Sequence, residues 1–421
     1  MRTGFSYQAG RLCAGGVPLE DLAASFGTPL YVYAAAAIDE RVAAVRASFD
    51  PLGVRLHYSV KANPNLHLLR HLLGLGLGFD IVSGGELARL LEVRVDPREV
   101  VFAGVGKTGE EMQAAVTAGV GLIIAESVGE VHRLARIAEA ADRAPLGIGL
   151  RLNPEVDAGT HRHITTGRRQ DKFGLLGEEY RALLDDGLWR GSLRLTGLHM
   201  HLGSQITSVA PYRAALTGLL ERLAEARAAG HEVRILDLGG GFGIAYDDRP
   251  VPTPGDYAAA LAPLLAGLDA VPLLELGRSL VGPAGVLLTR VEYVKPRDGG
   301  RLLIVDAGLT ELLRPALYEA HHRIEPVQEP VTDEHLNCDI AGPLCESSDY
   351  LARGRELPPL EPGDLLAVRD VGAYGLAMSG NYNSRLRPAE VWVEPDGTVR
   401  LIRRRETLDD LLAPERQRMI Q

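Results

Sequence analysis

Short apolar runs alternate with alanine- and leucine-rich stretches over the first two thirds of the chain. The runs end in polar or glycine residues, and helix-like segments such as 108–118, 128–141 and 211–229 lie between them. The predicted strands cover residues 56–61, 78–83, 100–104, 121–126, 148–153, 195–202, 235–239 and 272–276. Eight βα units predict a (β/α)8 TIM-type barrel. An open doubly wound sheet would usually offer a GxGxxG turn near its start.

The pattern changes near residues 280–290. The stretch VLLTRVEYVK, a PRDGG turn and RLLIVDAG read as a hairpin, and Pro- and Gly-punctuated short strands follow. Helical periodicity remains only at 310–319 and 373–379. We therefore expect three parts, which are an N-terminal segment (1–35), the barrel (36–283) and a C-terminal β domain (284–421).

The amino-acid composition limits the classes of partner that the protein is expected to bind. The 421 residues are 46% hydrophobic, 24% charged and 5% aromatic, with a formal net charge of −10. A net negative charge does not favour binding to the phosphates of nucleic acid or to an anionic membrane, so a small-molecule partner is expected. Three widely spaced cysteines make neither a disulfide framework nor a zinc pattern, and no metal site is expected. The first residues lack the apolar core of a signal peptide, so the expected location is the cytoplasm.

Polar residues stand where the predicted barrel strands end. Side chains at the carboxyl ends of barrel strands converge on one mouth, so these residues are interpreted together. They are Lys61, Asp80 with Ser83, Arg151, His201 with Ser204, Gly239, Gly240, Gly241, Glu275 and Arg278.

Each residue also has a plain structural reading. Lys61 could be a solvated strand end, the glycine triplet a tight turn, His201 a core histidine and Glu275 the salt-bridge partner of Arg278. Together they indicate other chemistry: a lysine for a Schiff base, glycine amides for a phosphate, a histidine face for a ring and an acid for a ring nitrogen. That combination describes pyridoxal 5′-phosphate.

Seven motifs carry a family resemblance, in order and over nearly the whole chain. They are YSVKANPN, GFDIVSGGEL, HMHLGSQI, DLGGGFG, ELGRSLVG, GPLCESSD and GAYGLAMSGNYNSRLRPAEV. The chain thereby resembles the fold-type III pyridoxal-phosphate decarboxylases, and among them most closely the diaminopimelate decarboxylases. The resemblance implies a barrel followed by a β-barrel domain that includes the first residues, and a homodimer with active sites at the interface.

The resemblance also implies roles for the cofactor residues. Lys61 would hold pyridoxal phosphate as a Schiff base, and His201 would stack on its ring. The three glycines would hold the phosphate, Glu275 would pair with the ring nitrogen, and Tyr374 would lie near the phosphate and the substrate. Asp80 and Arg151 would support Lys61 and the cofactor.

The substrate residues follow in the same way. Arg278, Arg314 and Tyr318 match positions that grip a carboxylate, which arginine can hold bidentately. Cys345 matches a thiol that acts in proton transfer, and Glu346 matches an acid that binds a substrate ammonium. In the family each subunit of the dimer supplies both residues to the active site of the other. The plain alternatives are an inert core thiol for Cys345 and surface charges for Glu346 and Arg314.

The implied reaction is decarboxylation of meso-2,6-diaminopimelate at its D-centre, giving L-lysine and carbon dioxide. Ornithine decarboxylases read a distal amine rather than a carboxylate, and racemases of this fold carry an arginine where Glu275 stands. A decarboxylase for another carboxylated or basic amino acid stays open, as does a non-catalytic pyridoxal-phosphate-binding homologue.

Two positions depart from the family pattern. Leu276 replaces the proline of EPGR, and Ser348 replaces the glycine of CESGD. The first is expected to change little, whereas the second puts the local backbone in doubt because glycine there could have a positive φ. The basic stretch 161–174 corresponds in the family to a mobile loop over the active site.

Overall fold

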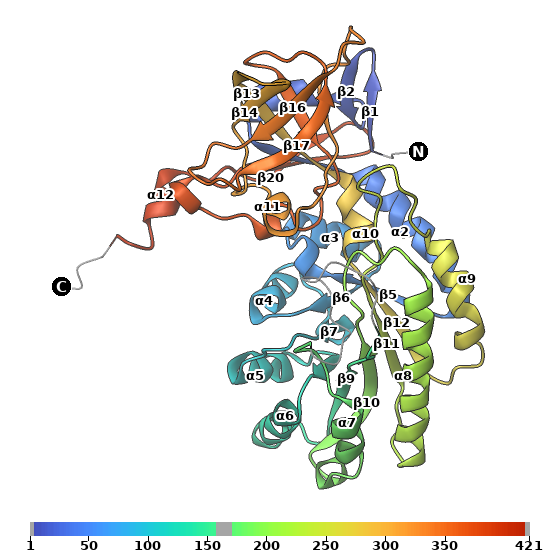
Figure 1. Ribbon diagram of the computed structural model, residues 1–421. Helices are drawn as coiled ribbons and strands as arrows, with labels where there is room; N and C mark the ends of the chain where they lie inside the picture. The colour runs from blue at the N-terminus through green and yellow to red at the C-terminus, as the bar shows by residue number, and fades with distance from the viewer. Residues whose placement is uncertain (1–3, 157–170, 417–421) are drawn as a thin grey trace, which may run out of the picture. The chain divides into compact units, whose positions relative to one another are not determined.

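The computed structural model describes residues 4–156 and 171–416, and the chain divides into two compact units (Figure 1). The barrel unit comprises Val42–Ile244 and Pro250–Ser279. The β unit comprises Met1–Arg41, Ala245–Arg249 and Leu280–Gln421.

Eight parallel strands close into a barrel in chain order, which confirms the predicted fold. Each predicted strand overlaps one observed strand. The strands are β5 (Arg55–Ser59), β6 (Gly78–Ile81), β7 (Val100–Phe102), β8 (Leu122–Ala125), β9 (Leu146–Leu152), β10 (Leu193–Met200), β11 (Ile235–Gly240) and β12 (Val271–Leu276).

Helices surround the barrel strands (Figure 1). Three of them are capped at the N-terminus by Ser83, Thr108 and Ser127, whose side chains accept a hydrogen bond from the backbone N–H three residues on. Ser83, grouped above with the strand-end residues, is therefore a helix cap. The helices are α3 (Leu66–Gly74), α4 (Gly84–Glu92), α5 (Gly109–Ala118), α6 (Val128–Ala140), α7 (Gly177–Leu184), α8 (Ala210–Ala228) and α9 (Pro254–Leu265).

Apolar side chains fill part of the barrel interior. Val101, Leu122, Ile124 and Leu273 form one buried cluster there. Gly149 leaves room for this cluster, since a Cβ on it would lie 2.4 Å from Ile124 Cδ1. Packing of this kind makes the barrel a solid core, and polar residues are buried near its carboxyl end.

The β unit is built around a sheet in the order β17-β16-β14-β13-β4-β19-β20. The long strands β13 and β14 form the predicted hairpin across the PRDGG turn. Strand β4, from the N-terminal segment, lies between β13 and β19. The sheet strands are β4 (Leu30–Ala34), β13 (Gly285–Arg297), β14 (Gly300–Val305), β15 (Ile324–Pro326), β16 (Leu336–Ala341), β17 (Tyr350–Leu357), β18 (Leu365–Val368), β19 (Ala389–Val393) and β20 (Val399–Arg403).

Helices in the β unit are short. The predicted helical stretch 310–319 forms only a five-residue helix, which ends where Glu319 adopts a left-handed φ of 52°. The stretch 373–379 forms only a single 3-10 turn, Leu376–Met378. The remaining elements are β1 (Phe5–Gln8), β2 (Arg11–Ala14), β3 (Val17–Pro18), α1 (Leu19–Phe26), α2 (Ala35–Phe49, shared with the barrel unit), α10 (Arg278–Val281), α11 (Arg314–Tyr318) and α12 (Leu408–Leu412).

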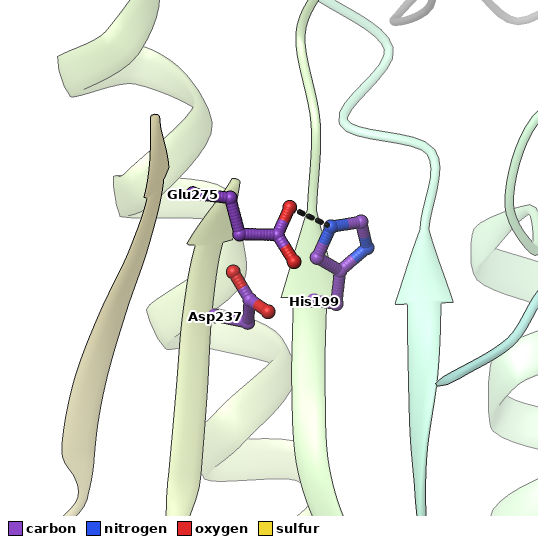
Figure 2. Close-up of side chains that lie close together, drawn as sticks. All are labelled: His199, Asp237 and Glu275. Atoms are coloured by element: carbon purple, nitrogen blue, oxygen red, sulfur yellow. Dashed lines mark ion pairs between the residues drawn. The ribbon is translucent and has the colours of Figure 1, made fainter. Parts of the chain in front are cut away.

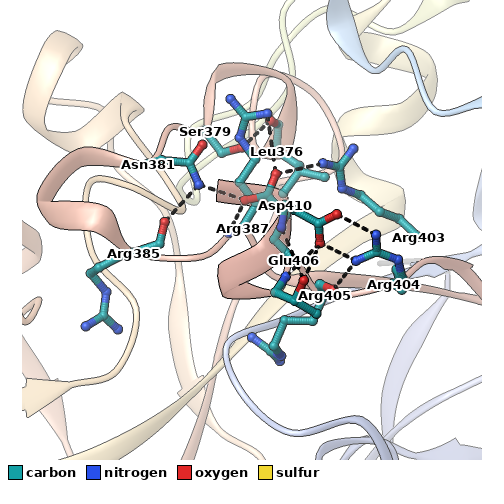
Figure 3. A network of polar contacts seen from close by, with 11 residues as sticks. Leu376, Ser379, Asn381, Arg385, Arg387, Arg403, Arg404, Arg405, Glu406 and Asp410 are labelled. Carbon is teal, nitrogen blue, oxygen red and sulfur yellow. Dashed lines mark hydrogen bonds and ion pairs between the residues drawn. The ribbon is translucent and has the colours of Figure 1, made fainter. Parts of the chain in front are cut away.

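Polar contacts hold the last described segment (Figure 3). Glu406 accepts hydrogen bonds from the backbone N–H of Arg387 and from Asn381 Nδ2, and the Arg404 guanidinium pairs with Asp410. None of the helices within the described ranges is both long enough and apolar enough to span a bilayer.

Candidate active site

Lys61 lies just beyond the first barrel strand. Strand β5 ends two residues earlier than predicted, and Lys61 stands in the 3-10 turn Val60–Ala62, closed by a 3.1 Å hydrogen bond from Asn63 N to Val60 O. Its Nζ is 3.4 Å from Asp80 Oδ2, and its side chain is 34% exposed. Lys61 is therefore held by a buried acid yet remains accessible.

The carboxyl of Asp80 is buried in the barrel. Burial and the neighbouring Glu275 carboxylate raise the pKa of Asp80 to about 8, although Lys61 opposes the shift. Asp80 is therefore mainly protonated at neutral pH, and the nearby ammonium of Lys61 favours its ionised form. Lys61 and Asp80 thus form a pair in which each side chain influences the charge of the other.

His201 lies beside the glycine turn Gly239–Gly241 at the end of β11. Its Nδ1 accepts a 3.2 Å hydrogen bond from the backbone N–H of Gly240. That donor assigns the ring proton of the neutral imidazole to Nε2. Desolvation and the nearby Lys61 lower the pKa of His201 well below its ordinary value, so the ring is neutral.

The three glycines of the turn lie where side chains would not fit. Gly239 and Gly241 have φ of 63° and 98°. A Cβ on Gly240 would lie 1.6 Å from Glu275 O, and one on Gly241 would lie 2.1 Å from Gly203 O. The turn therefore requires glycine at these positions, and its bare backbone suits the close approach of a phosphate.

Glu275 is buried near the end of β12, and its ion pair is with a histidine. Its Oε2 lies 3.4 Å from His199 Nε2, whereas Arg278 donates a 2.9 Å hydrogen bond to Ser204 Oγ. Although burial would raise it, His199 and Lys61 bring the pKa of Glu275 below its ordinary value. Glu275 is thus an ionised acid available to a ring nitrogen.

Arg151 is buried at the end of β9 and pairs with an acid that was not among the predicted site residues. Its Nη1 lies 2.9 Å from Glu126 Oε1, an atom that also accepts from the backbone N–H of Gly104. The Phe173 ring lies 4.8 Å from the guanidinium carbon. Most of the expected mobile loop, 161–174, lies outside the described residues.

Arg314 and Tyr318 belong to the β unit, on α11. Arg314 is 5% exposed, so it is no surface charge. Its Nη1 lies 2.7 Å from His322 Nε2, and its guanidinium carbon lies 4.4 Å from the centre of the Tyr246 ring. These contacts fix the guanidinium of Arg314 in one direction.

The other β-unit residues lie in surface segments. Cys345 and Glu346 are exposed in the single chain, so Cys345 is not a core thiol. Glu346 accepts a hydrogen bond from the hydroxyl of Tyr382. Tyr374 has a positive φ of 57°, a strained conformation for a residue with a side chain.

Neither departure from the family motifs disturbs its surroundings. Leu276 is fully buried as the last residue of β12, and Glu275 and Arg278 flank it in the expected order. Ser348 does not have a positive φ, so the backbone there accepts a side chain.

Sequence reasoning missed His199, Asp237, Glu126, His322 and Tyr246. Glu126 follows β8 directly and obeys the same strand-end rule that selected Asp80. His199 lies on β10 and His201 directly follows its last residue, Met200, so the spacing of two puts both on one side of the chain, and their rings stand nearly parallel at 8°.

Comparison with known sequences identifies the family. The profile described as "Pyridoxal-dependent decarboxylase, pyridoxal binding domain" matches residues 35–282. The chain belongs to the pyridoxal-dependent decarboxylases. Within this family it is 46% identical to a diaminopimelate decarboxylase of Pseudomonas aeruginosa over 98% of both chains. It is 43% identical to the Neisseria meningitidis enzyme of that name, over 95% of this chain and 97% of the other.

A solved structure of the family supports the fold. The diaminopimelate decarboxylase of M. jannaschii in co-complex with L-lysine superposes with a TM-score of 0.92 at 36% identity, covering 98% of each chain. Pyridoxal 5′-phosphate is the cofactor of the family, and the barrel unit fits it. An accessible lysine, a turn that excludes Cβ atoms and a buried ionised acid are the groups its aldehyde, phosphate and ring nitrogen require.

Proposed function

We propose that this chain removes the carboxylate at the D-centre of meso-2,6-diaminopimelate, releasing carbon dioxide and L-lysine. The buried, oriented Arg314 is the observation that carries the substrate assignment. A decarboxylase that binds the distal carboxylate of its substrate needs such a guanidinium, whereas one that binds a distal amine does not. The relatives named diaminopimelate decarboxylase support the assignment.

The barrel unit supplies the cofactor site in this proposal. When bound, pyridoxal phosphate offers an aldehyde to an amine and a ring that accepts the electrons left by carbon dioxide. Lys61 would hold the aldehyde, and the glycine turn would receive the phosphate together with Ser204 and Arg278. Tyr374 of the β unit would be a further contact of the phosphate and the substrate. Glu275, as a carboxylate, would favour a proton on the ring nitrogen, and the neutral His201 would pack against the ring.

The β unit supplies substrate recognition. Arg314 and Tyr318 bind the distal carboxylate, with Arg278 as a further cation, and Glu346 accepts from the ammonium. Cys345 returns a proton to the carbon that lost its carboxylate. Asp80 and Arg151 orient the groups around Lys61.

We further propose a cytoplasmic homodimer with shared active sites. The three free cysteines suit a reducing compartment. Exposure of Cys345, of Glu346 and of the large apolar residues Tyr382, Leu401 and Leu408 suits a face that a second copy covers. Mixing Lys61→Ala subunits with Cys345→Ala subunits should restore activity, because hybrid dimers regain one intact site. Failure of this mixture to regain activity argues against shared sites.

Release of carbon dioxide tests the substrate assignment. We expect turnover with meso-diaminopimelate and little with its L,L isomer, ornithine or lysine. A protein that binds the cofactor but does not turn over the meso isomer would refute the substrate and leave the cofactor site intact. Lys61→Ala protein should lose the bound chromophore on dialysis, and retention of a covalent chromophore would show that another lysine is used.

A further inference from the structure

Three buried polar residues lie close together in the barrel unit (Figure 2). His199, Asp237 and Glu275 come from β10, β11 and β12, and their exposures are 1%, 0% and 3%. Each offers an atom within 4.8 Å of the others. Figure 2 shows the Glu275 carboxylate between the other two groups.

Two neighbouring carboxylates in a dry interior cannot both be ionised without a large cost, so one of them takes a proton. We assign the negative charge to Glu275, because its Oε2 faces His199 Nε2 at 3.4 Å. Burial and the Glu275 carboxylate raise the pKa of Asp237 well above its ordinary value. The proton therefore belongs to Asp237.

The hydrogen-bond inventory agrees with this assignment. Among the described residues, Asp237 Oδ2 and Glu275 Oε1 are buried and have no hydrogen-bond partner. A proton on Asp237 Oδ2, directed at Glu275, would satisfy a donor and an acceptor together. The other oxygen of Asp237, Oδ1, accepts a 2.9 Å hydrogen bond from the backbone N–H of Gly239. Asp237 thereby connects Glu275 with the first glycine of the phosphate turn.

We propose that Asp237 and His199 are positioning residues that hold Glu275 as an oriented carboxylate. Asp237 stays a carboxylic acid that donates to Glu275 and accepts from Gly239, and His199 lies against the other oxygen of Glu275. The inference rests on the proposed function, in which Glu275 faces the ring nitrogen of the cofactor. It assigns roles to two residues that do not touch the cofactor themselves.

Infrared spectroscopy of the wild-type holoenzyme tests the proton on Asp237 directly. A buried carboxylic acid gives a C=O stretching band that a carboxylate does not. Asp80, with a pKa of about 8, can give a similar band, so difference spectra between the wild type and each variant are compared. We expect a C=O band in the wild type minus Asp237→Asn spectrum and none in the spectrum of wild type minus the control Asp306→Asn, which removes an acid of the β unit. Absence of a C=O band from the wild type minus Asp237→Asn spectrum would overturn the proposal.

Cofactor binding and kinetics provide a second readout. Asparagine copies a neutral acid, because its NH2 can donate to Glu275 and its oxygen can accept from Gly239. Asp237→Asn should therefore keep the cofactor dissociation constant within about threefold of the wild type, whereas Asp237→Ala should weaken binding about tenfold or more. An Asn variant as impaired as the Ala variant would show that Asp237 must be ionised, which contradicts the proposal.

His199 variants separate positioning from a general structural role. His199→Gln retains a donor toward Glu275 and His199→Leu does not. We expect kcat of the leucine variant to fall about tenfold with KM nearly unchanged, and the glutamine variant to recover much of the loss. Equal loss in both variants, or a loss confined to KM, would refute this role.

Three further outcomes have clear meanings. A stoichiometric metal ion that leaves on chelation would mean that the three residues are ligands, and it would overturn the proposal, because their atoms could serve either use. Wild-type protein that binds no pyridoxal phosphate would refute the proposed function and the inference with it. Normal cofactor binding by the wild type with loss in Asp237→Asn would refute the inference alone.

Discussion

Each unit of the molecule buries a charged side chain against a histidine, and the two histidines have opposite roles. In the barrel unit, His199 lies 3.4 Å from the Glu275 carboxylate. In the β unit, His322 Nδ1 lies 2.8 Å from the carbonyl oxygen of Arg369, and its Nε2 lies 2.7 Å from Arg314 Nη1. A carbonyl can only accept, so Nδ1 donates and Nε2 accepts from Arg314.

The difference shows how one residue type serves two tasks. In the barrel unit the histidine favours a negative charge to which we assign a part in the chemical step. In the β unit a neutral histidine and the Tyr246 ring orient a positive charge to which we assign substrate binding. Disturbing the first should change kcat, whereas disturbing the second should change KM.

The largest effect is expected for Glu275→Gln. The variant loses the carboxylate to which we assign the ring-nitrogen proton, and removal of one such electrostatic group costs about 10²–10³ in kcat. KM for diaminopimelate should stay close to wild type, and the cofactor should remain bound at Lys61. Steady-state kinetics at saturating pyridoxal phosphate measures both constants. A raised KM with unchanged kcat would reverse the role assigned to the barrel unit.

Arg314→Leu should act on binding instead. Truncation of one member of a buried charged pair costs about 2–5 kcal/mol. We therefore expect kcat/KM for diaminopimelate to fall at least about thirtyfold, mostly through KM, with Arg314→Lys intermediate because lysine lacks the planar fork. Any residual turnover of lysine, which has no distal carboxylate, should not fall in parallel. A parallel fall would show that Arg314 does not read that group.

Asp80→Asn should separate stability from function in the barrel unit. The folded pKa of Asp80 is about 8, above the ordinary value of 3.8. The folded state therefore favours the protonated acid, and this contribution is full below pH 4 and is lost as the pH rises through 8. The cofactor-free variant should exceed the wild type in unfolding free energy by a few kcal/mol at pH 8, since one pKa unit is worth about 1.4 kcal/mol.

Denaturant unfolding at pH 5 and pH 8 measures this difference, which should widen with pH. The same variant should lose activity, because Lys61 loses its 3.4 Å acid partner. Thr407→Ala, which removes a helix cap in the β unit, serves as a control whose effect should not depend on pH in this range. A gap that narrows toward pH 8 would mean that Asp80 is ionised at little cost.

The sequence predicted the barrel because alternation and strand count are local signals. The same signals selected Lys61, Asp80 and Glu275 at strand ends. The partners of Glu275 depend on the pairing between strands: His199 stands opposite Asp237 in the β10–β11 ladder, although 38 positions separate them in the chain. Alternation along one strand cannot reveal such a pairing.

The contacts of Arg314 in the β unit could not be predicted from the sequence for a different reason. Arg314 and His322 are separated by an irregular turn at Glu319, whose φ is 52°. A regular helix of the predicted length, 310–319, would have directed these side chains elsewhere. Tyr246 is more distant still, since it comes from the short insertion Ala245–Arg249 between two parts of the barrel unit. Backbone conformation, rather than residue type, decides these contacts.

The smallest effect is expected at His322, where two substitutions test the acceptor role. In His322→Gln the new side chain is uncharged and can offer an oxygen near the position of Nε2, whereas in His322→Phe the ring fills the space and offers no acceptor. Loss of a hydrogen bond to a charged group costs about 1.5–3 kcal/mol, so His322→Phe should raise KM about tenfold to a hundredfold with kcat nearly unchanged. His322→Gln should recover most of that loss, and the control His335→Gln, at an exposed histidine, should match the wild type. If both His322 variants lowered kcat at constant KM, the histidines of the two units would act alike. The contrast between His199, which favours the charge of Glu275, and His322, which orients Arg314, would then be wrong.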